Sequence, residues 1–127
     1  MGPIVKYGFR SETIQVLDVS PGALDQGLAV QAVLASPRAE AARAALERAQ
    51  AFIRDNQVLD DLPEHARYFR HPSRGGWPFS DRAHGWPISD CTAEGLKAAL
   101  GLEAAGLSRA AVPEERLQDA LELLLGY

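Results

Sequence analysis

The chain has few of the features that assign a protein to a class by composition alone. It has a single cysteine, Cys91, so no disulfide can form within its 127 residues, and a reducing compartment is the expected environment. No stretch approaches the roughly 20 apolar residues of a membrane-spanning helix. No signal peptide is visible, because no apolar run follows a basic segment near Met1. We therefore expect a cytoplasmic or peripheral membrane location.

The charge pattern excludes further classes. The 13 basic residues are interspersed with 17 acidic ones, and the net charge is −4. This pattern lacks the basic stripe of a nucleic-acid-binding surface, so no nucleic acid partner is expected. The sequence shows no metal-ligand spacing and no phosphate-binding loop. Neither a metal nor another cofactor is predicted.

Helical patterns dominate the first half of the chain. Hydrophobic residues make up 46% of a chain long enough for one domain with a modest core. Ser20-Pro21 is a typical helix start and predicts a helix to about Ala35. Ser36-Pro37 repeats the signal and predicts a second helix to about Arg54. Two helices joined this closely should pack antiparallel.

A second pair of helices is predicted near the end of the chain. The third helix should begin near Ser89 or Asp90 and run to about Leu102, with Gly106 in the turn beyond it. The fourth should begin at Pro113. Helix pairs that recur every 40 to 50 residues or so are typical of stacked helical-pair folds. The expected buried stripe of the fourth helix is Leu117, Leu121 and Leu124.

Two segments carry no helical pattern. Residues 1–19 are weakly strand-like and are treated as an uncertain leader ahead of the domain at residues 20–127. Residues 56–85 contain several prolines and the pair Gly75-Gly76, which predicts a tight turn. An irregular segment this long in a small domain is usually functional. It and the residue after it hold most of the aromatic side chains: Tyr68, Phe69, Trp77, Phe79 and Trp86.

Asp90 stands at the start of the predicted third helix. Taken alone, an aspartate in this place is most often an N-cap that accepts a backbone hydrogen bond. Ser89 could be the cap instead, which would leave Asp90 in the first turn. Cys91 alone would be a small buried apolar residue, and Thr92 and Glu94 would be ordinary polar residues of the first turn.

The run Ser89-Asp90-Cys91-Thr92-Ala93-Glu94 resembles the acid motif of the oxidosqualene cyclases. The resemblance is strong from Gly75 to Leu100 and extends more weakly over roughly residues 24–126. It implies an all-α fold of the terpenoid cyclase type, built from the helical hairpins of an (α/α) toroid. Residues 20–127 would be a fragment of that domain with a long aromatic loop.

The resemblance also implies roles for single residues. Asp90 would be the proton donor, and Cys91 would hydrogen-bond to it and polarise it. Phe79 matches a cavity aromatic that faces the cations formed along the substrate. His84 and Ile88 match positions that set the product, and this pair resembles the cycloartenol-forming type more than the lanosterol-forming type.

Trp86 is a further candidate for the substrate site. Its alternative role, shared with Trp77, is to pack the loop onto the helices. His84 likewise could be a surface or turn histidine, and Phe79 could be plain loop packing.

The implied reaction is protonation of the epoxide of 2,3-oxidosqualene, followed by cationic cyclisation to a sterol precursor. A carboxylic acid can do this only if an apolar cavity keeps it protonated. Aromatic faces stabilise the cations by about 1–2 kcal/mol each when water is excluded. The family implies an apolar C30 epoxide as substrate and a monotopic association with membranes.

The chain departs from the family in ways that bear on function. Leu24 stands where the family has a tryptophan, and Met1 to Ser20 does not resemble it. Tyr127 falls before the family's glutamine-tryptophan repeat would begin. We therefore expect the isolated chain to be inactive. The alternatives are a non-catalytic helical module, one half of a split cyclase that pairs with a chain carrying the remainder, or an unrelated helical domain.

Overall fold

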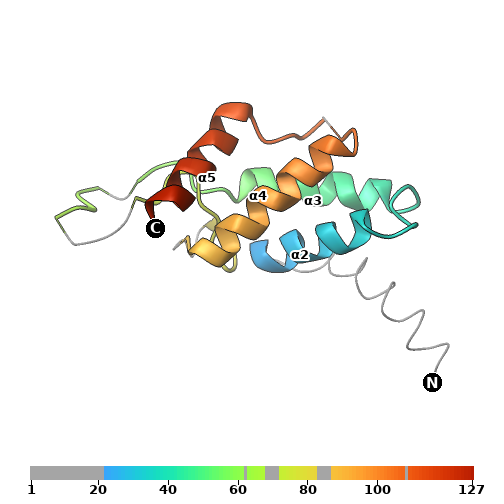
Figure 1. The fold of residues 1–127 in the computed structure, drawn as a ribbon, viewed down its shortest axis with the longest axis horizontal. Coiled ribbons are helices and arrows are strands. Elements are labelled where there is room, and N and C mark those ends of the chain that lie inside the picture. Colours follow the sequence, from blue (N-terminus) through green and yellow to red (C-terminus); the bar gives the residue numbers. More distant parts are fainter. Residues whose placement is uncertain (1–21, 62, 68–71, 83–86, 108) are drawn as a thin grey trace, which may run out of the picture.

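The computed structural model describes residues 22–61, 63–67, 72–82, 87–107 and 109–127. These residues form four helices and no strand beyond an isolated antiparallel bridge between Pro78 and Pro87 (Figure 1). The all-α prediction is confirmed. The uncertain leader at residues 1–19 lies outside the described residues. The helices are α2 (Ala23–Leu34), α3 (Arg43–Asp55), α4 (Ser89–Ala104) and α5 (Glu114–Gly126).

The helices form two consecutive hairpins, α2 with α3 and α4 with α5. The chain reverses direction within the α2–α3 hairpin, as predicted, and α2 and α4 run side by side in the same direction (Figure 1). Two close approaches fix this parallel pair. A Cβ on Gly27 would lie 3.2 Å from the carbonyl oxygen of Glu94, and one on Gly101 would lie 3.1 Å from Leu34. The arrangement agrees with the stacked helical pairs that the sequence predicts.

The start of α3 differs from the prediction. The helix begins at Arg43, whereas Ser36-Pro37 predicted a start six residues earlier, and residues 37–42 form turns. The Ser36 hydroxyl donates to the carbonyl of Val33 at 2.7 Å and accepts the N–H of Arg38 at 3.2 Å. It therefore closes the end of α2 and opens a turn. Serine makes such local bonds readily outside helices as well as at their starts.

The end of α4 follows the prediction. Gly106 adopts a φ of +88°, a left-handed conformation that residues with a side chain rarely adopt. Its N–H donates to the carbonyl of Glu103 at 3.0 Å, and the N–H of Leu107 donates to Leu102 at 3.1 Å. This pair of bonds is a Schellman motif, which satisfies the last carbonyls of the helix. The start of α5 at Pro113 is confirmed as well.

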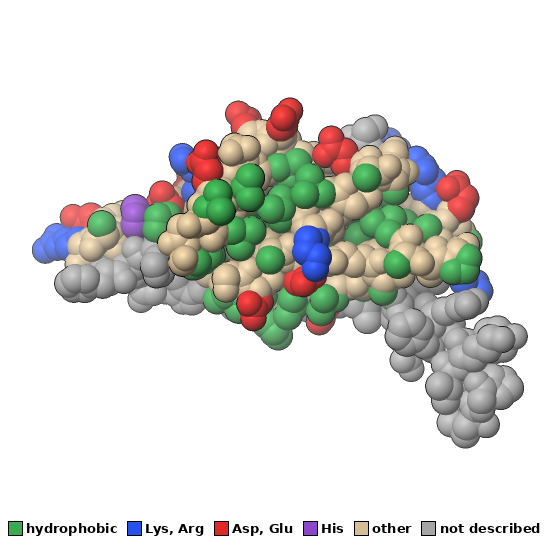
Figure 2. Space-filling view, viewed as in Figure 1, with side chains coloured by type: hydrophobic (Ala, Val, Ile, Leu, Met, Phe, Trp, Pro, Cys, Tyr) green, Lys and Arg blue, Asp and Glu red, His purple; other side chains and the backbone are tan. Residues whose placement is uncertain are grey.

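The buried stripe of α5 was predicted correctly only in part. Leu117 packs partly buried against the core, but the buried residues of the helix are Ala120 and Leu123, and Leu121 is 42% exposed. The glycine pair explains the difference, because it packs against this face of α5. Gly75, at a φ of +94°, leaves no room for a Cβ beside the backbone of Asp119 and Ala120, and Gly76 lies against the Leu123 side chain. Hydrophobic side chains remain visible over α4 and α5 in the space-filling view (Figure 2).

Trp77 joins the irregular segment to the helical core. Its side chain is fully buried, and its indole N–H donates to the carbonyl of Ile53 in α3 at 2.8 Å. The ring lies on Gly95 of α4, where an added Cβ would come within 2.5 Å of the indole. Trp77 therefore packs the loop onto the helices, as predicted from the sequence.

This packing predicts unequal effects for two neighbouring aromatic residues. Trp77→Ala should lower the free energy of unfolding by about 3–5 kcal/mol, because it leaves a cavity between α3 and α4. Phe79→Ala is the matched control, since Phe79 is 63% exposed and its loss should cost no more than about 0.5 kcal/mol. Urea denaturation followed by circular dichroism measures both values. Equal losses for the two variants would contradict the assigned packing.

Candidate functional site

The candidate site lies at the N-terminal tip of α4. Ile88 is the N-cap residue, with extended backbone angles and no side-chain cap. Its carbonyl accepts the N–H of Thr92 at 2.9 Å, the first bond of the helix. Neither Ser89 nor Asp90 caps the helix, although both were considered for that role. Asp90 lies in the first turn, where a negative charge interacts favourably with the helix dipole.

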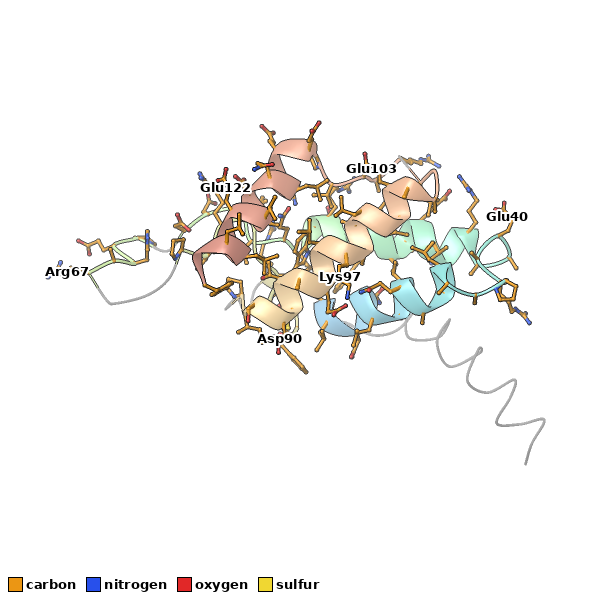
Figure 3. The ribbon with its side chains drawn as sticks, in the orientation of Figure 1. Glu40, Arg67, Asp90, Lys97, Glu103 and Glu122 are labelled. Carbon is orange, nitrogen blue, oxygen red and sulfur yellow. The ribbon has the colours of Figure 1, made fainter. Side chains whose placement is uncertain are left out.

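Asp90 and Cys91 have opposite environments. Asp90 is exposed and lies at the tip of α4 (Figure 3). Cys91 is 1% exposed and belongs to the buried face of the same turn. Burial raises the pKa of the Cys91 thiol, and the neighbouring Asp90 charge raises it further. The thiol is therefore held in its protonated form next to the candidate acid.

Two exposed apolar side chains accompany Asp90. Phe79 is 63% exposed and Ile88 is 45% exposed. Each follows a residue of the bridge between Pro78 and Pro87, which brings their two segments together. The carbonyl of Phe79 also accepts the N–H of Leu24 at 3.3 Å, so its backbone is fixed at the start of α2.

The structure thus brings four predicted residues to one end of the molecule: Asp90, Cys91, Phe79 and Ile88. The other two, His84 and Trp86, lie outside the described residues. Their part in the substrate site remains a prediction. So does the hydrogen bond from Cys91 to the acid.

Thr92 has a role that the sequence analysis missed. It was interpreted as an ordinary first-turn residue, but its side chain is fully buried and its Oγ1 accepts the backbone N–H of Trp77 at 3.1 Å. The signal in the sequence was its spacing. Thr92 lies on the same helical face as Gly95, Ala99 and Leu102, all small or apolar residues.

Glu94 has a second unexpected role, because it joins α4 to α2. Its Oε2 accepts the side-chain amide of Gln31 at 2.5 Å, and its Oε1 accepts the Lys97 amine at 3.2 Å. The Gln31 hydrogen bond lowers the pKa of Glu94, and Lys97 lowers it further against the opposing effect of burial. The acid motif therefore contains residues that hold the helices together around Asp90.

Asp90 lines neither of two cavities in the described part of the chain. One of about 330 Å³ lies between α5 and the loop, with Asp61, Arg74, Glu122 and Tyr127 in its wall. The other, of about 440 Å³, is lined by Arg48, Arg54 and Arg109 among others. Within the described ranges, no group of three or more histidine, cysteine or acidic residues could hold a metal ion.

None of the described helices combines the length and the apolar character needed to cross a membrane.

The chain is similar in sequence to parts of several curated proteins. It is 43% identical over 120 residues to the terpene cyclase/mutase atnI of Arthrinium sp, which covers 91% of this chain and 16% of that protein. It is 38% identical over 101 residues to the cycloartenol synthase of Dictyostelium discoideum, a match that covers 80% of this chain and 14% of that protein. The lanosterol synthase of Mus musculus is 44% identical over 81 residues, a match that covers 63% of this chain and 11% of that protein. No family model matches the chain.

The chain therefore spans less than a fifth of the length of these relatives.

The hydrogen bonds of Glu94 predict a pH-dependent contribution to stability. A lowered pKa in the folded state stabilises the fold above the unfolded value of 4.5, and this stabilisation is lost as the pH falls through the folded value. Glu94→Gln should therefore lower the free energy of unfolding by about 1 kcal/mol at pH 7. The difference in unfolding free energy between the variant and the unsubstituted chain should narrow as the pH falls below 4.5 and close once the pH is below the folded-state pKa of Glu94.

Denaturation curves between pH 3 and about 7 measure this gap. Glu103→Gln, an exposed position at the other end of α4, serves as the control and should follow the unsubstituted chain at every pH (Figure 3). A gap for Glu94→Gln that stays constant with pH would contradict the prediction.

Proposed function

Because this chain belongs to the oxidosqualene cyclase family, we propose that it supplies the proton-donating wall of a cavity that cyclises 2,3-oxidosqualene. Asp90 is the proton donor, and Cys91 hydrogen-bonds to it. The proposal is supported by one observation above the others: Asp90 lies in the first turn of α4, Ile88 is the N-cap residue of that helix, and the bridge between Pro78 and Pro87 brings the segment of Phe79 to it. Epoxide opening requires an acid in apolar surroundings, and the exposed side chains of Phe79 and Ile88 provide part of such a surface.

The proposed step transfers one proton. The carboxyl proton of Asp90 moves to the epoxide oxygen, the bond from that oxygen to the more substituted carbon breaks, and a tertiary cation forms while Asp90 becomes a carboxylate. The π electrons of the next double bond then attack the cation. Phe79 presents an aromatic face that stabilises positive charge, an effect worth about 1–2 kcal/mol in a desolvated site. His84, Ile88 and Trp86 would complete the substrate contacts and bias the product toward a cycloartenol-like or lanosterol-like skeleton.

The isolated chain does not enclose this site. Asp90, Phe79 and Ile88 are all exposed, so water has access to the acid and to any cation formed there. An acid of this kind works only where water is excluded, because solvent favours the charged carboxylate and would quench the cation. The enclosing walls must therefore come from further polypeptide that covers the tip of α4.

A second function is favoured by the remaining apolar surface. Leu100, Leu121 and Leu125 are exposed on α4 and α5, and large exposed apolar patches mark surfaces that contact another protein segment. These residues would let the chain pair with a second polypeptide carrying the rest of a cyclase. If that partner supplied its own acid, the chain would instead be a non-catalytic helical module.

The exposure of Asp90 predicts that the isolated chain makes no cyclic product. Purified chain incubated with racemic 2,3-oxidosqualene and detergent should give no tetracyclic alcohol by gas chromatography and mass spectrometry. The Dictyostelium cycloartenol synthase is the positive control under the same conditions. A tetracyclic product that depends on Asp90 would show that the chain encloses its own site and would refute this prediction.

The role of Asp90 is tested in an enclosed setting by a chimera. This chain replaces the aligned segment of the Dictyostelium cycloartenol synthase, and turnover of 2,3-oxidosqualene is measured. Asp90→Asn should lower kcat by about 10²–10⁴-fold, the usual contribution of a general acid. Glu103→Gln removes an exposed carboxylate from the same helix and should change kcat less than about twofold.

Two results would contradict the proposed function. One is a folded chimera that gives no product before any substitution. The other is an Asp90→Asn variant as active as Glu103→Gln.

A further inference from the structure

A connected set of hydrogen bonds lies directly behind the candidate acid. The Thr92 Oγ1 accepts the backbone N–H of Trp77 at 3.1 Å, and hydrogen bonding with Thr92 lowers the pKa of the Tyr127 hydroxyl against the larger raising effect of burial. That hydroxyl in turn donates to the carbonyl of Pro87 at 3.4 Å. Thr92 is fully buried, so its hydroxyl has to be satisfied by these protein groups.

The donors and acceptors define one direction for this set. The Trp77 N–H can only donate, and the Pro87 carbonyl can only accept. Each hydroxyl has one proton. All three bonds are made when Trp77 donates to Thr92, Thr92 donates to Tyr127 and Tyr127 donates to Pro87.

This arrangement connects the three segments that carry the candidate site. Trp77 lies two residues before Phe79, Pro87 directly precedes Ile88, and Thr92 lies two residues after Asp90. The bridge between Pro78 and Pro87 joins the first two segments, and the second of them continues into α4 through Ile88, its N-cap residue. The Thr92 hydroxyl adds a direct side-chain link from the Trp77 segment to the helix turn that displays the acid.

We propose that Thr92 is a positioning residue, which holds the Asp90 turn of α4 in a fixed orientation relative to the segment that carries Phe79. The proposal rests on the proposed function of Asp90. An acid must meet the epoxide while the aromatic face meets the cation formed from it, so the two groups need a constant relative geometry. A hydroxyl bonded on both sides provides this where packing alone would allow the segments to shift.

Other groups hold the same turn less directly. The Trp77 ring on Gly95 fixes the loop to the middle of α4, and Glu94 fixes α4 to α2. Neither contact bonds the backbone of the loop to the turn that carries Asp90. Substitutions at Thr92 can therefore separate a positioning effect from an effect on the stability of the core.

The test uses isotope-labelled full-length chain and three variants. Thr92→Val keeps the shape and removes the hydroxyl, Thr92→Ser keeps the hydroxyl, and Tyr127→Phe removes the hydroxyl at the next position. Amide exchange reports the Trp77 hydrogen bond, with the amide of buried Ala49 in α3 as the reference for global unfolding. Residual dipolar couplings of the Phe79 and Asp90 amides report the orientation of the loop relative to α4.

We expect Thr92→Val to raise the exchange rate at Trp77 by at least about tenfold relative to Ala49, since one hydrogen bond to a buried amide is lost. The couplings of Phe79 should fall in magnitude while those in the middle of α4 stay unchanged. Thr92→Ser should restore both values to within about twofold. Tyr127→Phe should give a smaller rise at Trp77, of about threefold, and it remains informative if Thr92→Val does not fold.

The proposal is overturned if Thr92→Val accelerates exchange equally at Trp77 and Ala49 with unchanged Phe79 couplings, because Thr92 would then contribute only stability. It is overturned equally if Thr92→Ser behaves like Thr92→Val, or if Tyr127→Phe leaves Trp77 unaffected when Thr92→Val cannot be measured. These measurements use no substrate. An active Asp90→Asn chimera would therefore remove the proposed function without changing the result for Thr92.

Discussion

The burial of one indole ring determines the rest of the structure. Trp77 belongs to a segment with no regular structure, yet its ring lies between α3 and α4. Its indole N–H donates a hydrogen bond to the carbonyl of Ile53, and its backbone N–H donates one to the Thr92 hydroxyl. Gly95 provides the space, because any side chain there would meet the ring. An aromatic residue buried in this way contributes several kcal/mol, of the order lost when it is replaced by alanine. It fixes the loop to α3 and α4 close to the turn that carries Asp90.

The candidate site consequently combines residues that are held by contacts within the chain with residues that are exposed to solvent. Thr92, Glu94 and Trp77 are held by contacts within the chain, whereas Asp90, Phe79 and Ile88 are exposed. The geometry of the proposed acid is therefore provided by this chain. The chain does not provide the low dielectric that would keep this carboxyl group protonated. That property depends on whatever covers the tip of α4. The chain spans 16% or less of the length of these relatives. It can still position the acid, because the hydrogen bonds that do so lie within a helical pair. An enclosed cavity needs walls from more distant parts of a polypeptide.

The sequence predicted the features that depend on local chemistry. Gly106 ends α4 because a left-handed residue is needed there, and Pro113 precedes α5 because proline suits the start of a helix. The predictions failed where tertiary contacts override local patterns. The Ser36 hydroxyl bonds to a carbonyl of the preceding helix and does not start the next one. The glycine pair of the loop packs against a face of α5 that the leucine spacing of this helix did not indicate. In the site, the acid motif identified the turn, but the buried position of Thr92 depends on where the Trp77 backbone comes to lie.

The protonation state of Cys91 gives the proposed reaction a direction. Burial and the Asp90 charge both raise the pKa of the thiol, so it remains neutral across the physiological range. A neutral thiol can donate a hydrogen bond, and the carboxylate left after proton transfer accepts one more strongly than the carboxylic acid before it. The proposed contact would therefore strengthen as the epoxide takes the proton, which lowers the energy of the products of that step more than that of the reactants. A thiolate in the same place would add a second negative charge and oppose the transfer, so the raised pKa of Cys91 is consistent with the proposed chemistry.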